Sequence, residues 1–99
     1  MEINTEVCGG TRKLRIAGDM TIYGAGELKK SIIESVSSGG RTELDLSQVD
    51  EIDTAGVQLL ILAVREARLL GKELGIISAS SAVASILKLY NLLDFLAVA

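Results

Sequence analysis

The stretch ELDLSQVDEIDTAGVQLL, residues 43–60, decides the fold. In its first half, Leu44 and Leu46 alternate with acidic residues, which is the period-two pattern of a half-buried strand. From Val57 a dense apolar run continues as far as Arg65, and its residues are helix-prone and too many for a second strand. The stretch therefore predicts a strand that leads through a short acidic loop directly into a helix.

Asp53 stands at the junction between this strand and this helix. Aspartate is a good N-cap residue, and its carboxylate can accept a hydrogen bond from the free amide of Ala55 or of Gly56. A helix N-terminus also presents unpaired N–H groups, which suit a carboxylate, a phosphate or an acceptor on a partner. We therefore expect the functional site, if the protein has one, at Asp53–Gly56.

Composition limits the classes of function. The chain has 99 residues, 48% of them hydrophobic and 23% charged, which fits a single globular domain over 1–99. Its 10 basic and 13 acidic residues give a net charge of −3, and aromatic residues make up only 3%, so nucleic-acid binding is not expected. Arg65 interrupts the longest apolar run well short of a membrane span, so we expect no direct membrane insertion.

Several chemistries are also disfavoured. The sequence has no histidine, which removes Ser-His-Asp and Cys-His machinery and histidine-ligated zinc, so we expect no enzyme. The acids Asp45, Asp50 and Glu51 match no calcium-loop spacing and are expected to be solvated, while Asp53 serves as the cap. We expect no metal and no cofactor. A single cysteine, Cys8, and an acidic N-terminal start without a signal-peptide core predict a cytoplasmic protein.

The remaining elements follow from periodicity. Two alternating runs, residues 3–7 and 13–16, flank Gly9-Gly10 and predict a β-hairpin. A helix is predicted from Thr21 or Tyr23 to the stop at residues 37–40. The chain from 72 to 78 predicts another strand.

The last part of the chain predicts a helix capped by Ser80 or Ser81, followed by an extended piece over 95–98. The resulting order, ββαβαβα, predicts an α/β domain with a mixed, mostly parallel sheet. The N-terminal hairpin would supply its antiparallel pair, and the helices would cover mainly one face.

Residues 44–56, LDLSQVDEIDTAG, resemble the signature of the STAS family, the domain of anti-sigma-factor antagonists and of sulphate-transporter tails. Residues 18–21 look like the family's second marker, the loop that ends the second strand, and the region 81–92 is similar to its last helix. The resemblance covers nearly the whole chain. It implies a non-catalytic module that docks another protein through the Asp19 loop and the helix end at Thr54.

The motif departs from the phospho-regulated members of that family at one position. Their partner kinase usually modifies a serine that stands two residues after the aspartate, and here that position is Ala55. Thr54 is the only hydroxyl of the motif, and it could be a phosphoacceptor, a docking hydroxyl or a part of the cap. The Asp-Thr-Ala-Gly variant also looks like that of STAS subunits of phospholipid-trafficking ABC transporters and of some chemotaxis-linked members.

The helix after Gly56 predicts a partly apolar exposed strip. At 100° per residue the strip contains Thr54, Ala55, Gln58, Leu62, Arg65 and Leu69. Scattered exposed leucines are ordinary, but a strip aligned with the motif favours a partner surface. The candidate partner-binding residues are Asp19, Met20, Asp53, Thr54, Ala55, Gly56, Gln58 and Leu62.

Two kinds of protein partner follow from the resemblance: an anti-sigma kinase-like regulator and the cytoplasmic ATPase of an ABC transporter. The sequence leaves the choice between them open, as well as the oligomeric state and any nucleotide binding. An enzyme is the poorly supported alternative, because no nucleophile–base pair can be assembled from these residues.

Overall fold

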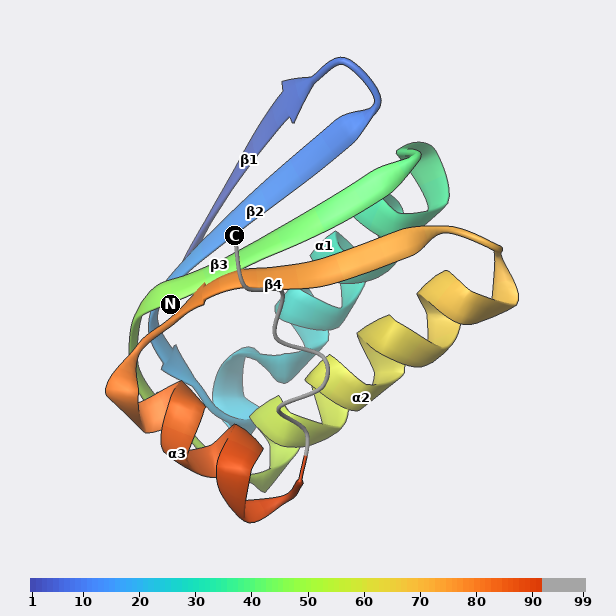
Figure 1. The fold of residues 1–99 in the computed structure, drawn as a ribbon. Helices are drawn as coiled ribbons and strands as arrows, with labels where there is room; N and C mark the ends of the chain where they lie inside the picture. The colour runs from blue at the N-terminus through green and yellow to red at the C-terminus, as the bar shows by residue number, and fades with distance from the viewer. Residues whose placement is uncertain (92–99) are drawn as a thin grey trace.

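The computed structural model describes residues 1–91 as one α/β unit (Figure 1). Its elements, in chain order, are β1 (Glu2–Cys8), β2 (Thr11–Met20), the single-turn 3-10 helix η1 (Ile22–Gly24), α1 (Ala25–Ser38), β3 (Arg41–Ile52), α2 (Thr54–Leu69), β4 (Glu73–Ala79) and α3 (Ser81–Leu89). The predicted ββαβαβα order is confirmed, with η1 as the one addition.

The four strands found within residues 1–91 form one sheet in the order β1-β2-β3-β4. β1 and β2 pair antiparallel through the predicted hairpin, and Gly9 in its turn has a φ of +61°, a conformation that favours glycine. β3 runs parallel to both of its neighbours, β2 and β4. The mixed, mostly parallel sheet with one antiparallel pair is therefore confirmed.

One face of the sheet carries α1 and α2, which lie side by side (Figure 1). Alternation on the strands supplies the core beneath them: Leu14, Leu44 and Ile76 stand in one row across β2, β3 and β4, and all three are fully buried. From α1, Leu28 and Ile32 fill the same core. This arrangement fixes the two helices against the strand ends from which they begin.

The third helix lies beside β3. β4 ends at Ala79, which pairs with Leu46, so the second half of β3 has no β4 residue opposite it. There α3 begins, with the Ser80 amide donating to the Leu46 carbonyl at 3.0 Å. The Ser80 hydroxyl accepts from the Val83 amide at 3.3 Å, which confirms the first of the two predicted caps.

The differences from the sequence-based boundaries are small. The strand predicted over 72–78 is found at Glu73–Ala79, and the first long helix begins at Ala25, after η1. Gly71 follows α2 at φ +66°, the left-handed conformation in which a glycine commonly ends a helix. The extended piece predicted over 95–98 lies outside the described residues.

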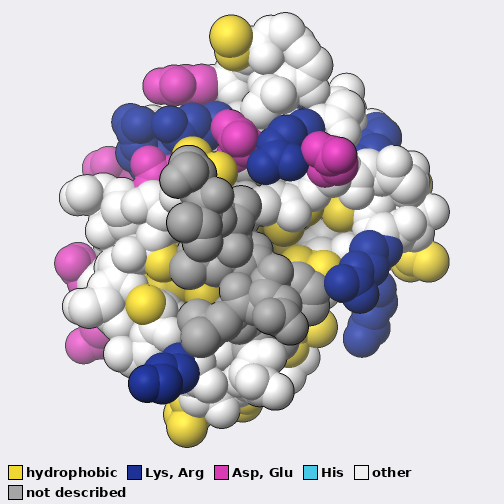
Figure 2. Space-filling model, viewed as in Figure 1, with side chains coloured by type: hydrophobic (Ala, Val, Ile, Leu, Met, Phe, Trp, Pro, Cys, Tyr) yellow, Lys and Arg dark blue, Asp and Glu magenta, His cyan; other side chains and the backbone are white. Residues whose placement is uncertain are grey.

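The opposite face of the sheet carries charged side chains, and Figure 2 shows basic and acidic groups intermixed across it. Arg41 contacts Glu43 at 3.3 Å and Glu73 at 2.9 Å, which joins neighbouring strands. Arg15 on β2 contacts Asp45 on β3 at 3.3 Å. Glu43 and Asp45 of β3 thus contact basic side chains on the side away from α1 and α2.

Asp45 corrects one expectation, because it is only 8% exposed and not a solvated acid. Its Oδ1 accepts from the Ser47 amide at 3.0 Å and from the Ser47 hydroxyl at 2.6 Å, and Arg15 donates to Oδ2. Asp45 stands where the register of β3 shifts against β2 and against β4, so the carboxylate fastens an irregular point of the sheet. Burial opposes its ionisation, but the hydrogen bonds from Ser47 and Arg15 outweigh burial and lower the pKa of Asp45.

We predict an acid-sensitive contribution of Asp45 to stability. A carboxylate whose pKa is lowered by folding stabilises the fold above its unfolded-state value of about 4, and this stabilisation is lost as the pH falls through the folded-state pKa. Asp45→Asn should lower the free energy of unfolding at pH 7 by about 1–3 kcal/mol, and it should flatten the loss of stability below about pH 4. Urea unfolding between pH 7 and pH 2.5 measures both, with exposed Asp50→Asn as the control. Equal acid dependence in Asp45→Asn and wild type would contradict the prediction.

Candidate functional site

The candidate site forms where the end of β2 meets the start of α2. Asp53 joins the two segments: its Oδ1 accepts from the Gly56 amide at 3.1 Å, and its Oδ2 accepts from the Ile22 amide at 3.1 Å. The Asp53 amide in turn donates to the Met20 carbonyl at 3.2 Å. One residue therefore caps α2 and also fixes the chain that leaves β2.

The cap on Gly56 confirms one of the two acceptor geometries expected from the sequence. The bond to Ile22 was not predicted, because it joins residues 31 positions apart and depends on the parallel pairing of β2 with β3. Since both carboxylate oxygens already bind backbone amides, Asp53 positions the site more than it offers a free carboxylate to a partner.

Gly56 packs against the end of β2. It is buried, and a Cβ built on it would lie 2.5 Å from the Met20 carbonyl oxygen and 2.7 Å from Ile52 Cγ1. A side chain at this position would therefore displace backbone atoms. Met20 itself is 1% exposed. Both residues were expected to contact a partner, and burial corrects this: they set the distance between β2 and α2.

Thr54 is exposed at the first position of α2. Its hydroxyl makes no hydrogen bond to any of residues 1–91, and Asp53 supplies the cap. The interpretation of Thr54 as a part of the cap is therefore wrong. Beside it, Ala55 is half-buried and Gln58 is exposed, so the predicted strip does begin at the motif.

The strip borders a groove. Leu62 is half-buried and packs against the core, whereas Arg65 and Leu69 are exposed. Between α2 and the η1–α1 segment lies an open groove of about 410 Å³, and its wall includes Ala55, Gln58 and Leu62. Three of the candidate residues therefore line one concave surface.

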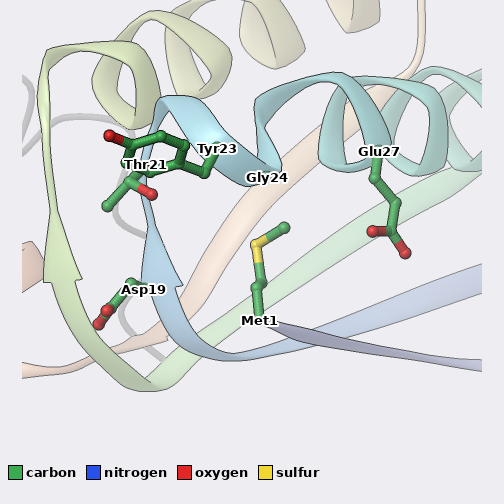
Figure 3. Close-up of a pocket in the computed structure, with 6 residues that line it drawn as sticks. All are labelled: Met1, Asp19, Thr21, Tyr23, Gly24 and Glu27. Carbon is green, nitrogen blue, oxygen red and sulfur yellow. The ribbon is translucent and has the colours of Figure 1, made fainter.

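Asp19 borders a separate depression on another side of η1 (Figure 3). This depression, of about 400 Å³, is lined by Met1, Asp19, Thr21, Tyr23, Gly24 and Glu27. Asp19 is exposed at the end of β2, and Glu27 comes from α1. On η1, Ile22 lines the groove and is 67% exposed, while Tyr23 lines the depression and is 97% exposed; sequence reasoning missed this pair of side chains.

Residues 1–91 contain neither a cluster of metal ligands nor a membrane-spanning helix. Within that range no three His, Cys, Asp or Glu side chains come together as metal ligands would. No helix there is long and apolar enough to cross a membrane.

We predict that Asp53 contributes to stability through both of its hydrogen bonds. Asp53→Ala removes the cap and the Ile22 contact and should lower the free energy of unfolding by about 2 kcal/mol. Asp53→Asn retains one acceptor oxygen but turns an amide N–H₂ toward the other amide, so its loss should be smaller than that of Asp53→Ala. Urea titration measures both against Glu51→Ala, a neighbouring exposed acid. Wild-type stability in Asp53→Ala would contradict the prediction that these two hydrogen bonds stabilise the fold.

We also predict that Gly56 is required for packing. Gly56→Ala should lower the free energy of unfolding by about 2 kcal/mol or more, since its Cβ meets a backbone carbonyl. Gly26→Ala is the matched control, because its Cβ enters open space in α1 and should leave stability equal or raised by up to about 1 kcal/mol. Thermal melting of both variants compares them, and equal melting temperatures would show that β2 and α2 can separate freely.

The fold is shared with several solved structures. Over 99% of this chain and 88% of theirs, it matches the anti-sigma factor antagonist SpoIIAA in its unphosphorylated form, with a TM-score of 0.84 and 15% identity. The phosphorylated form of the Bacillus cell fate determinant SpoIIAA gives 0.79 at 15% identity, covering 99% of this chain and 91% of that one. A protein of Thermotoga maritima described as a putative anti-sigma factor antagonist gives 0.85 at 20% identity, over 95% and 82% of the two chains. Likeness at these identities establishes the fold.

Family membership rests on the sequence itself. The family model described as Mlab, STAS domain matches residues 4–97, which include the strand, the loop and the helix of the candidate site. The chain belongs to the STAS domain family.

Proposed function

We propose that this protein is a non-catalytic regulatory module of the cytoplasm that docks another protein through the Asp53–Gly56 end of α2. The observation that carries the proposal is the position of Thr54: it is exposed, and its hydroxyl has no hydrogen-bond partner among the described residues. Asp53 and Gly56 hold that position rigidly from beneath. A rigid scaffold that presents an unpaired polar group is typical of recognition sites.

The chemistry of the site supports binding over catalysis. The chain contains no histidine, and Asp53, the carboxylate nearest to Thr54 in sequence, is engaged with two backbone amides. Thr54 therefore has no evident general base to activate it as a nucleophile. Donors and acceptors at the helix end remain available for a partner.

The partner that we propose first is an anti-sigma kinase-like regulator, by likeness to the anti-sigma factor antagonists. In this setting Thr54 is the candidate phosphoacceptor. A phosphate there would meet the amides at the start of α2 favourably but also the negative charges of Asp53 and Glu51. Docking through an unmodified Thr54 does not meet this repulsion.

Ala55 favours a second partner, the cytoplasmic ATPase of a phospholipid-trafficking ABC transporter. The Asp-Thr-Ala-Gly sequence resembles the variant of STAS subunits on such transporters, and Ala55 removes the hydroxyl that a partner kinase usually modifies. Cross-linking in the native cytoplasm followed by mass spectrometry separates the two partners, because one is a histidine-kinase-like protein and the other an ABC ATPase.

Variants at Thr54 test the docking site. Thr54→Glu should leave the free energy of unfolding within about 1 kcal/mol of wild type. The new carboxylate is repelled by Asp53 and Glu51, but its attraction to the α2 dipole offsets part of that repulsion. In an interface the new carboxylate must be desolvated, so affinity for the cross-linked partner should fall by about 100-fold or more. Thr54→Ala should change stability by less than about 1 kcal/mol and weaken binding only mildly.

The matched control is Ser81→Glu, which places the same charge at the first position of α3, also directly after its cap. Calorimetric titration should give wild-type affinity for this control. Undiminished affinity in Thr54→Glu would place the interface elsewhere on the domain.

A further inference from the structure

The groove beside Thr54 has an apolar wall. Ala25 and Ile22 face it from the α1 side, and Ala55, Ile61 and Leu62 face it from α2. Ile22 is 67% exposed, and Leu62 is half-buried, so apolar surface remains accessible there. The small side chains of Ala25 and Ala55 leave space near the motif end of the groove.

Both charged residues that line the groove are basic. Lys29 comes from α1, Arg65 comes from α2, and both are exposed. Neither has an ion-pair or hydrogen-bond partner among residues 1–91. The sequence explains this, since no acid stands three or four residues away from either of them. In contrast Lys30, the neighbouring lysine outside the groove, has Glu27 and Glu34 at those spacings.

The basic groove stands out because the whole chain carries a charge of −3. Two unpaired cations beside apolar surface therefore select a ligand that is itself apolar on one side and acidic along its edges. The wall on α2 extends from Ala55 to Arg65, which at 1.5 Å per residue is about 15 Å, or nearly three helical turns.

We propose that this groove binds an amphipathic helix of a partner protein, whose apolar residues enter between α1 and α2 while acidic residues at its edges pair with Lys29 and Arg65. Anchors at i, i+3/i+4 and i+7 match the length of the groove, as in other helix-in-groove complexes. The inference deepens the proposed docking function and rests on it, because the groove ends at Ala55, next to Thr54.

The helices of a second copy fit this groove poorly. α1 has two glutamates and two lysines, α2 has two arginines and one glutamate, and α3 has one lysine, so none carries a net negative charge. An anionic membrane is also disfavoured, since surface binding of that kind normally needs a cluster of about four to eight basic residues. An acidic partner helix therefore satisfies the groove best.

Selection from a displayed library of amphipathic helices tests the proposal directly. The library has fixed leucines at i, i+4 and i+7 and randomised flanking positions, and it is selected against the full chain. Enriched peptides should carry Asp or Glu at the flanks, and their amide chemical-shift changes should map to the groove. Lys29→Glu/Arg65→Glu should weaken such a peptide by about tenfold or more, with Lys30→Glu as the matched control. A Lys-flanked version of the peptide should regain affinity for the doubly reversed protein.

The same test can overturn the proposal. Three outcomes would overturn it: enriched peptides with neutral or basic flanks, amide chemical-shift changes outside the groove, or no enrichment of any peptide. Binding of phosphatidylglycerol vesicles that the double reversal abolishes, without peptide enrichment, would assign the groove to a membrane instead. Measuring the affinity of the cross-linked partner for the same variants and for Thr54→Glu separates the groove proposal from docking at Asp53–Gly56. If only Thr54→Glu loses binding, the groove proposal is rejected and docking at Asp53–Gly56 is retained. If only the double reversal loses binding, docking at Asp53–Gly56 is rejected and the groove proposal is retained.

Discussion

The carboxylate of Asp53 is the constraint on which the site depends. It binds the amide of Gly56 in α2 and the amide of Ile22 after β2, so one side chain fixes the beginnings of η1 and of α2. The short distance between Gly56 and the Met20 carbonyl adds a steric limit from the other side. A hydrogen bond that holds the segments together and a glycine that lets them approach act on the same joint. Thr54 takes no part in these contacts and is exposed beside them.

Local sequence patterns predicted what depends on local interactions. Alternation in β3, the Gly9-Gly10 turn and the cap from Asp53 to Gly56 all involve residues within a few positions of one another. These patterns also predicted a mixed, mostly parallel sheet, because strands joined through helices are normally parallel neighbours. The family resemblance then pointed to the same loop, for which periodicity alone gives no function.

The contacts missed by the sequence analysis depend on how distant segments pair. The Ile22 bond requires β2 and β3 to end side by side, and the burial of Asp45 requires register shifts that no alternation pattern indicates. The interior position of Met20 was missed for a similar reason, since a residue at a strand end faces inward only because α2 begins over it. The sequence therefore predicted the conformation of the loop at Asp53–Gly56, while the division into positioning and exposed residues needed the structure.

Opposite charges on two sides of η1 would give the proposed docking surface a preferred orientation for its partner. Glu27 and Lys29 are two positions apart on α1, about 200° around the helix, so they line different depressions. Asp19 adds to the acidic side and Arg65 to the basic side, where the exposed, apolar Ile22 also lines the groove. A partner that binds across η1 in the reversed orientation would bring like charges together at both depressions. Because these interactions join solvent-exposed charges, this selectivity should weaken as the ionic strength rises.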